Sequence, residues 1–273
     1  MSLHEIEIIL LWFSTGLYVI ATTLALSGAL WTNAKLQEFG YWICAVAATS
    51  HGTGLLLRWY LAGRAPYQDT YEKLSSHAWW VLVMYLILVR MWPFMKQAGV
   101  LVYPATLLLT GWATLQSKDI TQVPATYQTF WLSVHVVFAK MSYGSALFAT
   151  GTSVMYLMKT RFLKVKESWL LKMPEPAQLD YYSYRLTAFA FVMMGVMIAS
   201  GAIWAHQAWG RYWFWDPIET WSLISWLCYG LYLHLRFTGG KPKHAALFNV
   251  FALFLLIITF FGLPYMYDSI HRS

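Results

Sequence analysis

A tryptophan-rich segment is the part of the chain whose residue types and order best indicate ligand chemistry. Residues 204–221 read WAHQAWGRYWFWDPIETW and contain five tryptophans. An aromatic belt at the membrane interface is the simplest interpretation. A belt, however, needs no fixed order and gains nothing from Asp216 and Glu219, which could accept hydrogen bonds and fix the loop, or from Pro217, which favours a turn or helix start. The order favours an apolar platform for a large planar ligand, each aromatic contact contributing about 0.5–1.5 kcal/mol beyond burial.

Histidine is the second residue type with a chemistry of its own, because imidazole is a common axial ligand of haem iron. Ionisable residues inside a bilayer are costly and are functional candidates by default. Of the eight histidines, His51 and His234 fall inside predicted membrane spans. His135 begins the fifth predicted span, and His271 follows the eighth. A planar ligand together with these histidines indicates haem.

The composition places these residues in a membrane protein. Of 273 residues, 59% are hydrophobic and only 11% are charged, against about 25% charged in soluble domains. So few charges cannot cover a globule of this size, which excludes a soluble enzyme, a disordered protein and a nucleic-acid-binding module. In such an apolar chain, the net charge of +7 indicates basic residues in cytoplasmic loops. The surroundings of the chain are then expected to be membrane lipid. Cys44 and Cys228 lie in apolar runs without zinc-site spacing, so neither a disulfide framework nor a metal finger is expected.

Eight apolar stretches could cross a bilayer, whose hydrocarbon core of about 30 Å needs about 20 helical residues. Backbone polar groups in lipid must bond within the chain, and no alternating ten-residue strands occur. The expected fold is therefore an all-α polytopic membrane protein. No linker or repeat divides the chain, which predicts a single membrane domain over residues 1–273. The expected spans are 6–30, 41–61, 77–95, 98–115, 130–158, 184–206, 221–236 and 245–264.

The basic residues of the loops predict the orientation of these spans. With residues at the ends of spans counted with the adjoining loops, twelve of the 19 Lys and Arg residues lie on the side of the 159–185 loop and six on the opposite side. Lys140, which lies deeper inside the fifth span, is counted for neither side. Because cytoplasmic loops are enriched in Lys and Arg, the 159–185 loop is expected in the cytoplasm and both termini outside. The Trp-rich segment, His135 and His271 are then expected on the outer side.

The Trp-rich segment is similar to a known signature. Residues 209–221, WGRYWFWDPIETW, resemble the WWD signature of the haem-handling protein superfamily. The form is that of the CcsA (ResC-like) branch, the integral component of system II cytochrome c biogenesis. Ile218 stands where this branch usually has a lysine. Other stretches that resemble the family are RWYLAGRAPYQDTYE at 58–72, WLSVHVVFAKMSYG at 131–144, SWLCYGLYLHLRF at 225–237 and SIHRS at the C-terminus.

The resemblance implies a set of haem ligands. His135 and His271 would be axial ligands of haem b on the outer surface. His234 would bind haem at a second site within the membrane, where a partner protein, CcsB (ResB-like), supplies the other ligand. His51 is then expected in a polar network rather than as a ligand. The residues of the signature that would hold the macrocycle are Trp209, Gly210, Tyr212, Trp213, Trp215, Asp216, Pro217 and Glu219.

The resemblance also implies a function. The chain would move haem outward and present it for thioether attachment to the CxxCH motif of apocytochrome c, as part of a haem-lyase complex with CcsB. Arg58, Arg64 and Arg211 are expected on the outer side, where they could bind haem propionates. The alternatives are a haem exporter or chaperone without ligation activity and a b-type electron-transfer membrane subunit. A bacterial inner membrane is the expected location, with a thylakoid membrane as the alternative.

Overall fold

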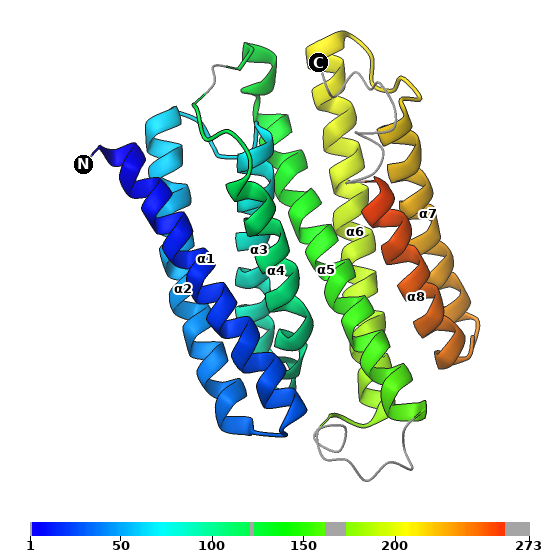
Figure 1. Cartoon of the computed structure of the whole chain (residues 1–273). Coiled ribbons are helices and arrows are strands. Elements are labelled where there is room, and N and C mark those ends of the chain that lie inside the picture. The colour runs from blue at the N-terminus through cyan, green and yellow to red at the C-terminus, as the bar shows by residue number, and fades with distance from the viewer. Residues whose placement is uncertain (1, 121–122, 162–172, 260–273) are drawn as a thin grey trace. The chain divides into compact units, whose positions relative to one another are not determined.

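The computed structural model describes residues 2–120, 123–161 and 173–259, and within these ranges the chain is helical with no strand (Figure 1). This confirms the all-α fold class. The helices are α1 (Leu3–Leu30), α2 (Ala34–Ala62), α3 (Thr70–Met91), α4 (Gly99–Thr114), α5 (Phe130–Arg161), α6 (Pro176–Trp209), α7 (Pro217–Phe237) and α8 (Pro242–Ile257), with the short 3-10 helices η1 (Pro93–Ala98) and η2 (Ala125–Tyr127).

The protein is an integral membrane protein. Helices α1, α3, α5 and α6 are long and apolar enough to cross a bilayer, and α8 is a shorter apolar helix. Each predicted span overlaps one of α1 to α8, whereas the number of crossings stays a prediction. The span predicted at 77–95 corresponds to a helix that begins earlier, at Thr70. The helix starts there because the Asp69 side chain accepts the backbone N–H of Glu72 and caps it.

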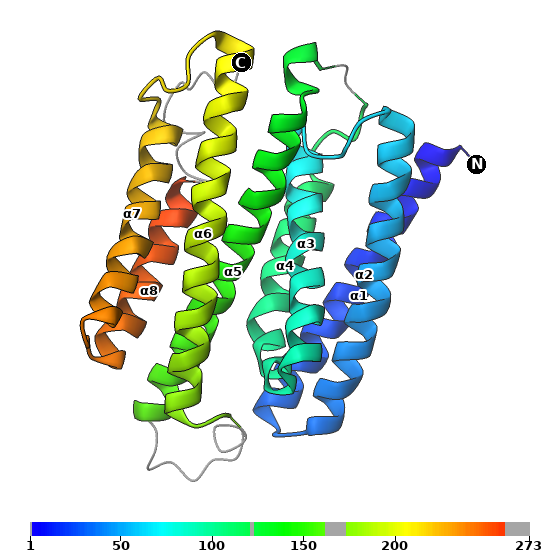
Figure 2. The same ribbon diagram turned by 180° about the vertical axis from the view of Figure 1, so that it is seen from behind.

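The described residues form two compact units, and the division falls after Pro124. Unit 1 contains α1 to α4, with α1 packed along α2 and α4 packed against both α1 and α3 (Figures 1 and 2). Unit 2 contains η2 and α5 to α8. Its centre is the long antiparallel pair α5 and α6, against which α7 and α8 pack. The single membrane domain expected from the sequence stays a prediction.

A buried polar cluster joins three helices of unit 2. Asn249 of α8 is completely buried. Its amide nitrogen lies 3.1 Å from the Ser153 hydroxyl and 3.0 Å from the hydroxyls of Ser183 and Thr187. Because hydrocarbon offers a polar side chain no other partner, such contacts hold membrane helices together. The cluster therefore ties α8 to both α5 and α6.

A ring stack fixes α7 against α6. The rings of Phe191 and Trp226 lie 4.9 Å apart at 4°, and Trp226 Nε1 donates to the Phe191 carbonyl at 3.1 Å. Two glycines make room for the rings. A Cβ at Gly195 would lie 3.3 Å from Trp226 Nε1, and one at Gly230 would lie 3.1 Å from Phe191 Cε2. The close approach sets the register of the two helices, and thereby the position of the loop that connects them.

Candidate functional site

The central part of the Trp-rich segment, residues 210–216, is the loop between α6 and α7. The start of α5, the end of α6 and the start of α7 lie at the same end of unit 2, which we call its loop end (Figure 1). Trp204 anchors α6 there, because its Nε1 donates to the Thr126 carbonyl at 2.9 Å. Its ring also packs on Tyr127, with centroids 5.7 Å apart. The helix end that carries the loop is therefore tied to the residues just before α5.

The backbone of the loop turns sharply at two positions. Gly210 ends α6 with a left-handed φ of 79°, which glycine adopts without a steric cost. Trp215 is also left-handed, with φ of 58°, which costs a residue with a side chain about 1–3 kcal/mol. The start of α7 directly follows. Asp216 caps this helix by accepting the Ile218 N–H at 2.9 Å, and Pro217 occupies the first helical position.

Glu219 holds the loop from the first turn of α7. Its Oε2 accepts the backbone N–H of Phe214 at 2.8 Å. Thr220 adds a weaker bond from its hydroxyl to the Trp215 carbonyl at 3.3 Å. A hydrogen bond to a carboxylate is stronger than one between neutral groups. The acidic residues of the signature therefore bond to backbone groups of the loop and of the helical turn that follows it, and so stabilise the shape of the loop.

The loop exposes aromatic faces. Trp215 is 71% exposed and Tyr212 57%, although both are large and partly apolar. Tyr212 stacks on His206 with ring centroids 4.2 Å apart at 16°, and Trp213 meets Trp215 edge-on at 5.8 Å. Arg211 lies nearby and is exposed. Exposed rings beside a cation could stack on a flat, anionic ligand.

His135 lies at the same end of unit 2. It is half-buried in α5, and its Nδ1 lies 2.8 Å from the Met197 carbonyl of α6. A carbonyl only accepts, so Nδ1 carries the proton, and the lone pair of the neutral ring is on Nε2. Gly201 packs against this imidazole and precedes Trp209 by about 12 Å along the helix, at about 1.5 Å per residue. The structure thus brings His135 and the Trp-rich segment to one end of unit 2.

The predicted membrane ligand lies at the other end of this unit. His234 is exposed in the last turn of α7. Pro217 begins that helix, and a rise of about 1.5 Å per residue separates the two by about 26 Å. His234 is therefore at the end of unit 2 opposite to the loop end. His271 lies outside the described residues.

His51 sits in a polar network of unit 1. It is 1% exposed, and both of its ring nitrogens have protein partners. Nδ1 lies 3.0 Å from the Tyr18 hydroxyl, and Nε2 lies 2.8 Å from the Ser75 hydroxyl. An imidazole with both nitrogens bonded in this way has no lone pair directed at a metal. The geometry therefore agrees with the network role expected for His51.

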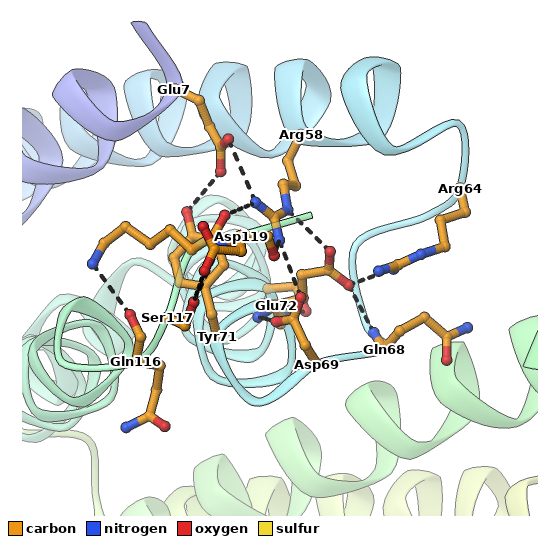
Figure 3. Close-up of polar contacts among 12 residues, drawn as sticks. Glu7, Arg58, Arg64, Gln68, Asp69, Tyr71, Glu72, Gln116, Ser117 and Asp119 are labelled. Carbon is orange, nitrogen blue, oxygen red and sulfur yellow. Dashed lines mark hydrogen bonds and ion pairs between the residues drawn. The ribbon is translucent and has the colours of Figure 1, made fainter. Parts of the chain in front are cut away.

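The stretch at 58–72 forms a buried ionic cluster in unit 1 (Figure 3). Arg58 of α2 is completely buried and makes four hydrogen bonds. Its Nε donates to Glu72 at 3.0 Å and its Nη2 to Asp69 at 3.0 Å. The backbone carbonyls of Lys118 and Asp119 accept the other two at 2.5 and 3.0 Å. One guanidinium therefore holds α2, the start of α3 and the segment after α4 together.

Further groups complete this cluster. Arg64 donates to the second oxygen of Glu72 at 2.6 Å, and Glu7 of α1 lies 3.8 Å from Arg58. Tyr71 also donates to Glu7, at 2.9 Å. Burial raises the pKa of the Asp69 carboxyl even though it lies beside Arg58. The expectation that Arg58 binds a haem propionate is therefore wrong, because its buried guanidinium bonds to carboxylates and carbonyls of the protein. Arg64 bonds to Glu72, and its expected role toward a propionate stays a prediction.

Three contributors to the loop end were not predicted from the sequence. Gly201 and the Thr126 carbonyl act through contacts with residues more than sixty positions away, so no local spacing indicates them. The third contributor is His206, which is not among the predicted ligands. His206 lies inside the Trp-rich segment, six residues before Tyr212, and this position could have indicated that the two rings stack.

The fold and the loop end define a class: an α-helical integral membrane protein with exposed aromatic residues and an oriented histidine at one end of a helical unit. Residues 67–271 match the family described as Cytochrome C assembly protein. The chain belongs to this family, which gives it a role in cytochrome c biogenesis.

Similar curated proteins carry the name Cytochrome c biogenesis protein CcsA. The protein from Synechococcus sp. (strain CC9605) is 31% identical over 91% of this chain and 91% of the relative. The protein from Trieres chinensis is 29% identical over 94% of this chain and 93% of the relative. The protein from Cyanophora paradoxa is 27% identical over 99% of this chain and 98% of the relative.

A solved structure shares the fold. The cytochrome c haem lyase CcmF superposes with a TM-score of 0.73 over 96% of this chain, at 14% sequence identity. This chain spans 47% of that protein. At such low identity, the likeness establishes the common helical fold and no shared activity.

Proposed function

We propose that the chain holds haem at the loop end of unit 2 and presents it for covalent attachment to apocytochrome c. It would do so as the haem-handling subunit of the system II cytochrome c synthase. The observation that carries the proposal is the loop itself, whose acidic residues fix its backbone while Tyr212 and Trp215 stay exposed. The name of the similar curated proteins, cytochrome c biogenesis protein CcsA, supports a part in the same process.

The donor set at the loop end suits haem b. Metal-binding histidines commonly donate their other ring N–H to a carbonyl, as His135 does to Met197. The flat exposed rings suit the macrocycle, and Arg211 could bind a propionate. We propose His135 as one axial ligand and, from the sequence resemblance, His271 as the other. His234 would serve a second site at the opposite end of unit 2, together with a ligand from CcsB.

The part of this chain in the reaction is to bind and orient its substrates. Haem supplies two vinyl groups, and each cysteine thiol of the CxxCH motif adds across one of them. A carbon–sulfur bond forms, and the thiol proton goes to the other vinyl carbon. Cys44 is buried, which suits packing rather than thiol exchange. We place the loop end on the outer side of a bacterial inner membrane or of a thylakoid membrane, because the opposite loops hold twice as many basic residues.

His135→Ala is expected to lower the haem content of the protein, purified with its partner, by about tenfold or more, because an axial ligand is lost. The absorption spectrum of the purified protein measures this, and added imidazole should restore it by filling the empty position. His244→Ala is the matched control, since His244 is exposed beyond the other end of α7. Haem content equal to that of the control would contradict His135 as a ligand.

Covalent attachment of haem to apocytochrome c distinguishes a synthase from a haem carrier. The purified protein and its partner, loaded with haem, are mixed with reduced apocytochrome c. The mixture is then denatured, so that only covalently bound haem stays on the cytochrome. Covalent haem supports the synthase. Transfer that does not survive denaturation would make the chain a haem exporter or chaperone instead.

A further inference from the structure

A single glycine in α6 makes room for the imidazole of His135. A Cβ built at Gly201 would lie 2.6 Å from His135 Nδ1 and 3.0 Å from its Cε1. Carbon and nitrogen atoms that are not bonded do not approach this closely in a packed interior. The imidazole therefore occupies the space in which any other side chain at position 201 would begin.

The close contact between the His135 imidazole and α6 also determines which ring nitrogen carries the proton. The imidazole can reach the backbone of α6 only because position 201 has no side chain, and there its Nδ1 donates to the Met197 carbonyl at 2.8 Å. This carbonyl also accepts the Ser200 hydroxyl at 3.1 Å. A carbonyl oxygen can only accept, so His135 Nδ1 is the donor in this contact. The neutral ring is then the Nδ1–H tautomer, with Nε2 as the metal-binding atom.

We infer that Gly201 and the Met197 carbonyl form a positioning device for His135. They fix the tautomer and the direction of Nε2 before haem arrives. The inference rests on the proposed function, in which His135 is an axial ligand. Gly201 is a positioning residue, since it acts through the imidazole. Glycine also weakens a helix interior relative to alanine, so a glycine within α6 calls for a local reason, and the imidazole supplies one.

Gly201→Ala is the direct test. The added methyl group collides with a ring that can rotate about its side-chain bonds, so we expect the ring to turn away while α6 stays intact. The thermal unfolding midpoint should be unchanged or higher, because alanine favours a helix. Haem content should fall about tenfold to a hundredfold, the usual effect of losing the partner that orients a metal ligand. Added imidazole should restore the haem spectrum.

Gly151→Ala is the matched control. Gly151 lies in α5, in a helix interior like Gly201, and a Cβ there would meet no atom within 4 Å. This variant should keep its haem and its stability. A second readout needs no haem: ¹⁵N-detected imidazole spectra of the haem-free protein should report the Nδ1–H tautomer for His135 in the wild type and its loss in Gly201→Ala.

The outcomes distinguish this inference from the proposed function. If His135→Ala loses haem but Gly201→Ala binds as much as Gly151→Ala and keeps the tautomer, the positioning role is wrong and the ligand stands. If His135→Ala keeps its haem, the proposed ligand is wrong, and the positioning role for haem falls with it. If Gly201→Ala lowers both the midpoint and haem content and imidazole restores neither, Gly201 serves helix packing alone and the inference is overturned.

Discussion

Arg58→Met is expected to lower the free energy of unfolding of unit 1 by about 3–5 kcal/mol, the usual cost of breaking a buried ionic cluster from one side. Methionine preserves much of the side-chain volume but leaves Asp69 and Glu72 without the cation that bonds to both. The carbonyls of Lys118 and Asp119 lose their donors as well. Thermal unfolding in detergent micelles, followed by circular dichroism, measures the change.

Arg90→Met is the control for this variant. Arg90 is exposed at the end of α3, so its replacement should leave the midpoint nearly unchanged. Adding Asp69→Asn to Arg58→Met should recover part of the loss, because a carboxylate that has lost its cation disappears while the asparagine oxygen can still cap α3. Equal midpoints for Arg58→Met and Arg90→Met would mean that the cluster does not hold unit 1 together.

Glu219→Ala is expected to release the loop of the Trp-rich segment and to reduce haem retention about tenfold to a hundredfold. The variant loses the acceptor for the Phe214 N–H, and hydrogen bonds to charged groups contribute about 1.5–3 kcal/mol. About 1.4 kcal/mol corresponds to tenfold in binding. The haem absorbance of the purified protein gives the retention, and limited proteolysis within residues 210–216 reports the release of the loop.

Glu219→Gln provides a graded comparison, because its amide oxygen can still accept the Phe214 N–H without the charge. We expect intermediate haem retention and little added proteolysis. Trp215→Gly should combine an intact loop with a loss of haem. Glycine adopts the left-handed backbone at position 215 without a steric cost, but the variant lacks an exposed ring. Its loop should resist proteolysis while haem is lost. Wild-type haem retention in Glu219→Ala would show that this carboxylate does not maintain the binding surface.

The helices could be predicted because lipid requires long apolar segments, and the predicted spans overlap them. The ends were less predictable. Hydropathy placed one span at 77 and another at 184, whereas α3 begins at Thr70 and α6 at Pro176. Polar residues in the first turns hide these starts from a hydropathy count. The local signals were Asp69 as a cap and Pro176 at the first helical position.

The shape of the loop was predictable in part, because its hydrogen bonds join residues that are close in the sequence. Asp216 and Glu219 were expected to be acceptors that fix the loop, and both bond to backbone groups within five residues. The partners of Arg58 were not predictable, since a basic residue near the end of an apolar helix indicates a charge but not which carboxylate it meets. Gly201 was missed because its role depends on the neighbouring helix α5.

The amide of Asn249 has a consequence for how unit 2 is assembled during synthesis. Its side-chain partners Ser153, Ser183 and Thr187 belong to helices that are made earlier. The hydroxyls of Ser153 and Ser183 also lie 2.7 Å apart, so these two can bond to each other before α8 exists. An unpaired amide in lipid is costly, so a newly made α8 is stable in the bilayer only after α5 and α6 have come together. We therefore expect insertion in a fixed order, with the helical hairpin first and α8 joining it later.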